Sequence, residues 1–292
     1  MSVQAPPYES LGPPIRGPGA LSGDWRRFWH LTFNIAVMQW KVRFYGSALG
    51  YVWQLVRPLL LFLVLYIFFT QIAHVGSGQG PSYHYYGAQL LSSVVLFTFF
   101  SEATMGAVRS VVDNEALVRK IQFPRMAIPM SVVLLAFFNL CLNLIVVMIF
   151  VLAAGVRPML TWLEVPLIVG LLVVLSTGVA MLLSSLFVYL RDIQPVWEVI
   201  SQVIFYASPV IIPVTTVQQK LGVTLTRLYM LNPLAVVFQQ FRHAVITHGT
   251  PSVGALLGST AAVALPVAIV LAIFVIGFWV FHRMAPRVAE DL

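Results

Sequence analysis

Long stretches without charge constrain this chain more than any other feature of its sequence. Between Pro58 and Ser101 there is no Asp, Glu, Lys or Arg, and in the whole chain only 9% of residues are charged while 59% are hydrophobic. A soluble domain carries roughly 25% charged residues, so water cannot solvate most of this chain. We therefore expect an all-α membrane protein, and we exclude soluble enzymes, disulfide scaffolds, coiled coils and disordered regulators.

Six segments are long and apolar enough to cross a bilayer. A helix rises about 1.5 Å per residue, so a hydrocarbon core about 30 Å thick needs about 20 apolar residues. Pro209 and Pro213 interrupt the far end of the fifth segment, and Gly and Pro at 76–81 separate the first two. The six expected transmembrane helices are 55–75, 87–108, 128–154, 163–190, 196–213 and 257–281.

The Lys and Arg residues predict the orientation of these spans, because membrane proteins collect basic residues on the cytoplasmic side. With a cytoplasmic N-terminus, only four of the 17 Lys and Arg fall outside: Arg157, Lys220, Arg227 and Arg242. We therefore expect a multi-pass protein with both termini in the cytoplasm. The net charge of +7 then follows from topology and requires no nucleic-acid partner.

The composition divides the chain into four parts. Residues 1–23 are rich in Pro and Gly and predict a disordered cytoplasmic tail. Residues 24–50 place aromatic residues at helical spacing with basic residues among them, which predicts an amphipathic helix along the inner leaflet. This interfacial helix either guides a lipid head group or anchors the chain. Residues 51–284 hold the six spans, and residues 285–292 form a second cytoplasmic tail.

The cytoplasmic connection after the second span predicts a short helix over 113–125. Asp113 and Glu115 at its start and Arg119 and Lys120 towards its end complement a helix dipole, and Pro124 ends the turn. Such a helix either presents a rigid surface to a cytoplasmic partner or only connects two spans.

The outside segment before the last span predicts a second helix, which begins at Asn232 and Pro233. Its apolar face contains Phe238 and Phe241, and Arg242 falls away from that face. This helix either dips back as a re-entrant gate or lies on the outer leaflet. Non-helical backbone at membrane depth is tolerated only inside protein or along a cavity, so we expect 208–213 to face a pathway.

The sequence contains no motif for catalysis, ATP binding or metal binding. There is no P-loop, no zinc spacing and no nucleophile motif, so we expect no catalytic residues, no metal site and no enzyme activity. Glu102 is the clearest ionisable residue within a span, and Arg109 follows on nearly the same helix face. Either both line a polar channel, or Glu102 pairs with a base on a neighbouring span. Thr161 to Glu164 fits a capping box.

Five patches of the sequence resemble, in the same order, the type-2 ABC exporter permeases of the polysaccharide and polyol phosphate family. The patches are 43–58, 114–125, 190–193, 208–210 and 231–234. This family includes O-antigen and teichoic acid permeases, and the Pro-rich tail most resembles its actinobacterial lipid-linked galactan exporters. The resemblance covers nearly the whole chain from about residue 40 to about residue 285.

This resemblance implies a homodimer in the bacterial plasma (inner) membrane, docked on two copies of a separate cytoplasmic ATPase. That partner would carry the P-loop, ATP and Mg²⁺, and this chain would need no cofactor. A polyprenyl diphosphate-linked polysaccharide would pass through the dimer channel to the outer side, and export would contribute to cell wall biogenesis. The main alternative is an ion-coupled flippase for lipid-linked glycans that works without an ATPase. A membrane enzyme of lipid-linked sugars is a further alternative.

The resemblance also implies roles for particular residues. The coupling helix would use Asp113, Glu115, Arg119, Lys120, Phe123, Pro124 and Arg125. The substrate entrance and its diphosphate contacts would use Arg43, Arg57 and Arg109, with Glu102 lining the channel. The outer gate helices, at roughly 214–247, would use Asn232, Pro233, Phe238 and Phe241, together with Pro209 just before them.

Overall fold

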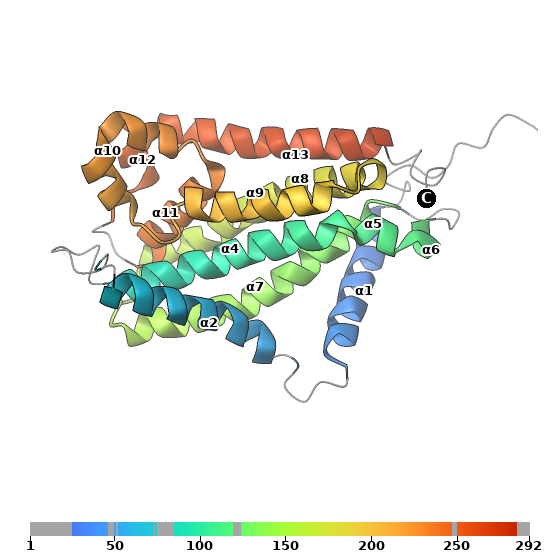
Figure 1. The fold of residues 1–292 in the computed structure, drawn as a ribbon, viewed down its shortest axis with the longest axis horizontal. Helices are drawn as coiled ribbons and strands as arrows, with labels where there is room; N and C mark the ends of the chain where they lie inside the picture. Colours follow the sequence, from blue (N-terminus) through green and yellow to red (C-terminus); the bar gives the residue numbers. More distant parts are fainter. Residues whose placement is uncertain are drawn as a thin grey trace, which may run out of the picture.

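The computed structural model describes residues 25–45, 50, 52–72, 74, 85–118, 124–246 and 250–284. Within these ranges the chain is helical and has no strand. The long helices run side by side along the longest axis of the molecule (Figure 1). The two tails predicted at 1–23 and 285–292 lie outside the described residues, so their disorder stays a prediction.

Among the described residues, five helices are long and apolar enough to cross a membrane, which confirms the all-α membrane architecture. They are Val52–Ile72, Tyr86–Val108, Ala127–Ala153, Leu160–Tyr189 and Ala261–Met284. The corresponding labelled helices are α2 (Val52–Ile67, continued by a π-helix over Phe68–Ile72), α4 (Tyr86–Val108), α7 (Ala127–Ala153), α8 (Val165–Tyr189) and α13 (Ala264–Met284). In its most apolar window α4 is 72% buried and the span of α8 is 67% buried, against 11% for α2, so α4 and α8 are inner helices of the bundle.

The expected span at 196–213 differs from its prediction. Here α9 (Ile193–Ala207) has 15 residues and ends before the break at 208–213, where Pro209 and Pro213 prevent its continuation. At about 1.5 Å per residue it is too short to cross a core about 30 Å thick by itself. After the break, α10 (Val214–Tyr229) and α11 (Pro233–Val245) form a pair bent by 114°, which is either one broken span or a re-entrant loop.

The last span also begins later than the predicted residue 257. A short helix, α12 (Val253–Leu257), ends at Gly258, whose φ of +91° is a left-handed conformation that suits glycine. A 3₁₀ turn over Ala261–Val263 then leads into α13. The chain therefore reverses direction at Gly258 before it starts its final helix.

The predicted interfacial helix is present as α1 (Trp25–Phe44), but its packing differs from the expected single aromatic face. Phe28, Thr32 and Ala36 are buried, whereas Trp25 and Trp29 stay exposed. Figure 1 shows α1 at a steep angle to the bundle, against α7. The aromatic spacing therefore divides between a face that packs on protein and a face that is free to meet lipid.

Two glycines allow α8 and α13 to pack in backbone contact. A Cβ added at Gly277 would lie 2.1 Å from the carbonyl oxygen of Gly178, and one added at Gly178 would lie 2.6 Å from the Cα of Phe274. Small residues at such positions are the usual means of close helix association in membranes, where apolar burial gives no preference for protein over lipid.

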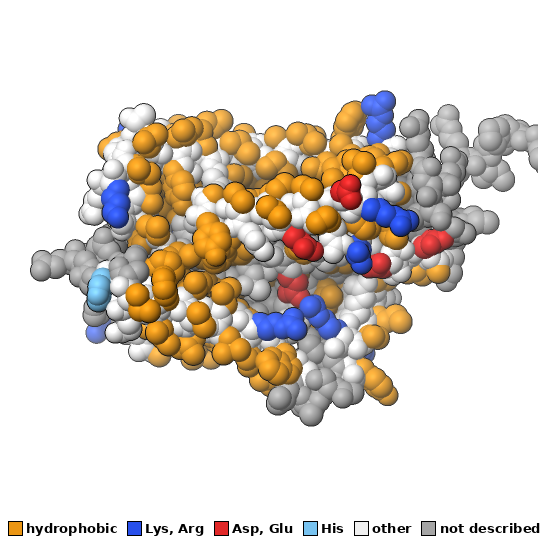
Figure 2. Space-filling model, viewed as in Figure 1, with side chains coloured by type: hydrophobic (Ala, Val, Ile, Leu, Met, Phe, Trp, Pro, Cys, Tyr) orange, Lys and Arg blue, Asp and Glu red, His pale blue; other side chains and the backbone are white. Residues whose placement is uncertain are grey.

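The surface separates apolar from charged side chains. Figure 2 shows hydrophobic side chains over much of the visible face, while most of its acidic and basic side chains gather towards the end where α5 and α6 lie. Large apolar residues such as Val64, Val203 and Ile276 are more than half exposed. A water-soluble protein rarely exposes so many, which agrees with a multi-pass membrane protein.

We expect Gly277→Ala to destabilise the bundle, because its methyl group would force α8 and α13 apart. Overpacking of this kind costs about 1–3 kcal/mol, and the thermal midpoint of the purified protein in detergent should fall. Gly170→Ala is the matched control, because a Cβ at this position of α8 has no atom within 4 Å. Equal midpoints for the two variants would contradict the close approach.

Candidate functional site

A cavity of about 820 Å³ lies between α2, α4 and α9 and is the main candidate site. Its polar lining combines two arginines and two acids with several amide and hydroxyl groups, and its apolar lining includes aromatic side chains. The charged members are Arg43, Arg57, Glu102 and Glu198. The cavity therefore has an amphipathic wall that suits a ligand with both a charged and an apolar part.

Glu102 sits where three elements meet. Arg43 Nη1, at the end of α1, lies 2.6 Å from Glu102 Oε1 in an ion pair. Asn139 Nδ2, on α7, donates to the same oxygen over 3.0 Å. Glu102 therefore lines the cavity and pairs with a base from a distant part of the chain, but this base lies at the end of α1 and not on a neighbouring span. The export channel itself stays a prediction.

Arg109 is separated from this cluster, contrary to the expected shared channel. Its Nε donates to Gln194 Oε1, and its guanidinium lies over the ring of Phe187, 5.9 Å from the centroid. Gln194 Nε2 in turn donates to Glu198 Oε1 over 3.2 Å. Arg109 therefore holds α9 against α4 and α8, and it is absent from the cavity lining.

The predicted coupling helix over 113–125 is not one continuous helix. Two four-residue helices, α5 (Ser110–Asp113) and α6 (Glu115–Val118), are joined at Asn114, whose side chain donates to the Ser110 carbonyl. Asp113 ends α5 instead of capping a longer helix, and Pro124 and Arg125 are buried. Arg119, Lys120 and Phe123 lie outside the described residues.

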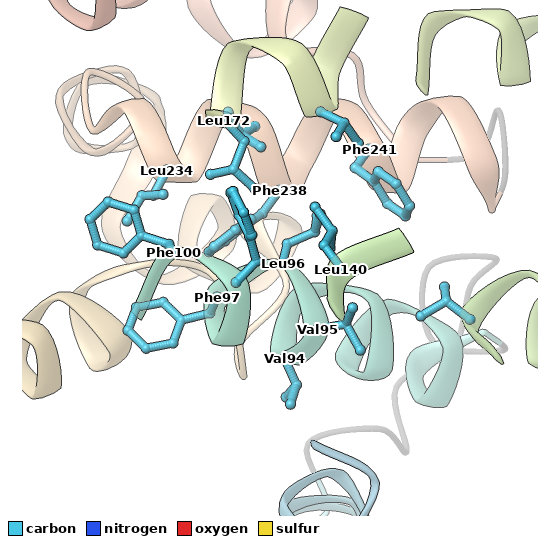
Figure 3. Packing of buried hydrophobic residues seen from close by; sticks show 14 of the residues in the cluster. Val94, Val95, Leu96, Phe97, Phe100, Leu140, Leu172, Leu234, Phe238 and Phe241 are labelled. Carbon is cyan, nitrogen blue, oxygen red and sulfur yellow. The ribbon is translucent and has the colours of Figure 1, made fainter. Parts of the chain in front are cut away.

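The expected outer gate is buried more deeply than a surface helix would be. Asn232 Oδ1 accepts from the Leu234 N–H over 3.0 Å, so the predicted cap of α11 is confirmed. Phe238 and Phe241 are fully buried and pack with Leu96 of α4 and Leu172 of α8 (Figure 3). This burial contradicts the alternative in which the helix lies passively on the outer leaflet.

Arg242 is the largest departure from the sequence analysis, which placed it among the bases outside the membrane. Its side chain is 1% exposed; its Nε donates to Ser93 Oγ over 3.0 Å and its Nη2 to the Val210 carbonyl over 2.9 Å. Tyr86 donates to the next carbonyl, that of Ile211. Arg242 follows Phe238 by four residues, so the two share a helix face, and the expectation that Arg242 falls away from the apolar face is wrong.

These bonds explain why the chain tolerates a broken segment at 208–213. Ser208, Val210 and Ile211 are buried, and Asn232 Nδ2 donates to Ser208 Oγ over 3.1 Å. None of the three residues lines the cavity. The segment is thus buried in the protein except at Ile212, which is 45% exposed, and the expectation that it faces a pathway stays a prediction.

The residues at 161–164 serve α11 instead of capping α8. They form a 3₁₀ turn with no capping bond from a side chain. Thr161 and Trp162 donate to the Ala244 and Val245 carbonyls, which lie in the last turn of α11 and have no helical partner. Glu164 accepts from Gln240 Nε2 over 2.8 Å. The predicted capping box is therefore wrong.

Comparison with known proteins agrees with this architecture. The family model described as "ABC-2 type transporter" matches residues 31–246. The O-antigen export system permease protein RfbA of Klebsiella pneumoniae is 26% identical over 253 residues, 86% of this chain and 91% of the relative. The protein of the same name in Myxococcus xanthus is 25% identical over 233 residues, 79% of this chain and 86% of the relative.

We expect Arg242→Met to loosen the end of the bundle that holds α10 and α11. Methionine fills much of the space but leaves the Val210 carbonyl and Ser93 Oγ without their donor. Loss of such buried charge-assisted bonds costs about 2–4 kcal/mol, so the thermal midpoint should fall and proteolysis near 208–213 should accelerate. Lys220→Met is the control, because Lys220 is an exposed base on the adjoining α10. If both variants match the wild type, Arg242 does not hold this segment.

Proposed function

Because the chain belongs to the ABC-2 type transporter family, we propose that it is the membrane permease subunit of an ATP-driven system that exports a lipid-linked polysaccharide. The substrate would be a glycan on a polyprenyl diphosphate, moved from the cytoplasm to the outer side of the bacterial plasma membrane. Relatives of similar length are named as O-antigen export permeases, which supports polysaccharide as the substrate class. A lipid-linked galactan is our narrower proposal for the glycan.

The observation that carries the substrate class is the chemistry of the cavity. Arg43 and Arg57 supply guanidinium groups, which bind phosphate oxygens through paired hydrogen bonds. Leu61, Phe97 and Tyr206 supply apolar and aromatic surface in the same cavity. A polyprenyl diphosphate needs both kinds of surface, and the sugar units suit the remaining amide and hydroxyl groups.

ATP hydrolysis would occur on a separate chain, because this sequence has no P-loop. We propose that two copies of a cytoplasmic ATPase dock at 113–125, which places the exposed Asp113 and the neighbouring α6 at the contact. ATP and Mg²⁺ would belong to that partner, and this chain would carry no cofactor of its own.

The remaining features of the proposal are a homodimer and a defined orientation. Two copies would enclose the export channel, and both termini would lie in the cytoplasm. The charge-rich end of the molecule in Figure 2 supports this orientation, since basic residues favour the cytoplasmic side. The bent pair of α10 and α11 would then form the outer gate, and α1 would lie along the inner leaflet.

We expect the double substitution Arg119→Glu and Lys120→Glu to weaken ATPase docking, because it reverses the charge of the proposed contact without changing a span. The tagged permease is purified in mild detergent, and the ATPase retained per permease is measured by quantitative mass spectrometry. Arg283→Glu is the control, because Arg283 is an exposed base near the end of α13 and lies outside the segment 113–125.

The same preparation tests the function itself. A P-loop protein retained in stoichiometric amount, together with ATP-dependent movement of lipid-linked glycan in vesicles, is the expected result. Movement of the glycan by the permease alone, driven by an ion gradient, would instead establish the flippase alternative. Full ATPase retention by the double variant would remove 113–125 from the docking surface.

A further inference from the structure

The two arginines of the cavity meet different partners. Arg43 is neutralised by Glu102 in the ion pair at 2.6 Å. Arg57 lines the same cavity, and no described carboxylate lies within the 4.0 Å that defines an ion pair. In the cavity wall, the Arg43 guanidinium is thus neutralised by Glu102, and the Arg57 guanidinium has no ion-pair partner among the described carboxylates.

Glu102 is held from two sides, and the two bonds are not equivalent. Asn139 is 2% exposed, so its amide is a fixed donor from the interior of α7. Arg43 approaches from the cavity, where the side chains of Arg43 and Glu102 are 38% and 22% exposed. If Arg43 turned away, Glu102 would keep a protein donor, and Arg43 would only need another anion.

We propose that Glu102 is an internal stand-in for the substrate's anion: it occupies Arg43 while the cavity is empty, and a lipid-linked diphosphate displaces it. Arg43 then exchanges a carboxylate for phosphate oxygens, and Arg57 binds the second phosphate. This inference rests on the function proposed above and adds a mechanism for selectivity. The site would favour diphosphates over monophosphates and neutral lipids.

The physical basis is that an exchange of anions keeps the charge of Arg43 compensated throughout. A lone guanidinium near lipid is costly, and a paired one is tolerated. Carboxylate and phosphate present similar oxygens to a guanidinium, so one replaces the other without a change of geometry. A neutral lipid offers no anion to replace Glu102 as the partner of Arg43. A single phosphate that displaced Glu102 would pair with only one of the two arginines.

Glu198 provides a matched comparison for Glu102. Both acids line the cavity, but Glu198 accepts from Gln194 and has no described arginine within ion-pair distance. Neutralising either acid changes the total charge of the cavity equally. Only neutralising Glu102 removes the competitor for Arg43, so the two variants separate an exchange from a general electrostatic effect.

The test measures binding of radiolabelled farnesyl diphosphate to the full-length permease with its partner ATPase, reconstituted in nanodiscs without nucleotide. We expect Glu102→Gln to bind about tenfold more tightly, the size of a partly exposed charge-assisted bond. Glu198→Gln should give a clearly smaller gain, which comes from the change in the cavity's total charge alone, and Arg43→Gln and Arg57→Gln should each bind more weakly. If Glu102→Gln does not fold, Glu102→Asp carries the test, because its shorter side chain weakens the pair and should give a smaller gain.

Unchanged or weaker binding by Glu102→Gln overturns the exchange, as does an equal gain for both glutamine variants. Inorganic pyrophosphate is the second probe. The same gain with pyrophosphate supports recognition of the anion alone, and a gain confined to farnesyl diphosphate supports an exchange that also needs the lipid. If neither probe binds any variant, the proposed substrate class fails. Binding that ignores Glu102 refutes only the exchange.

Discussion

Where a chain inside a membrane protein is not helical, its backbone N–H and C=O groups need hydrogen-bond partners from the protein. The arrangement of this chain depends on how it supplies those partners between α9 and α11. The carbonyls of Val210 and Ile211 accept from Arg242 and Tyr86, and α11 is capped by Asn232 at one end and by Thr161 and Trp162 at the other. Apart from the local cap by Asn232, each partner comes from outside the segment that it serves, so the end of the bundle that holds α10 and α11 packs as one unit.

The buried helix α4 connects the end of the bundle that holds α10 and α11 to the cavity. Ser93, which accepts from Arg242, lies about 10 Å along α4 from Tyr86 at about 1.5 Å per residue, so Arg242 reaches well into the bundle. Further along, Glu102 lines the cavity, and Arg109 at the end of α4 holds Gln194 of α9. A movement of α4 relative to α9 would therefore change contacts with α11, the shape of the cavity and the surroundings of the short helices α5 and α6.

The sequence predicted those parts of the fold that depend on local composition. Apolar length is a property of one segment, so most spans were found, and the pair Asn232–Pro233 contains its own capping chemistry. The position of Arg242 depends on the hydroxyl of Ser93 and on a break elsewhere in the chain, so no local pattern shows its burial. Glu102 was identified as exceptional, but its pairing with Arg43 joins residues 59 apart in the sequence. Thr161 to Glu164 matched a local rule, but their side chains in fact form hydrogen bonds with another helix, α11.

Arg242 and Arg43 show how the placement of an arginine decides between a structural and a functional role. Arg242 is buried and donates to neutral acceptors of the protein itself, Ser93 Oγ and the Val210 carbonyl. Its charged side chain therefore holds the non-helical segment 208–213 in place. Arg43 sits at the edge of a cavity and is matched by a carboxylate that has another donor in Asn139. A buried arginine with fixed acceptors stabilises one conformation. An arginine that can exchange one anionic partner for another stays neutralised both in the empty and in the occupied cavity. On the proposed function, a permease that binds and releases an anionic lipid would need the second arrangement at its cavity and the first away from it.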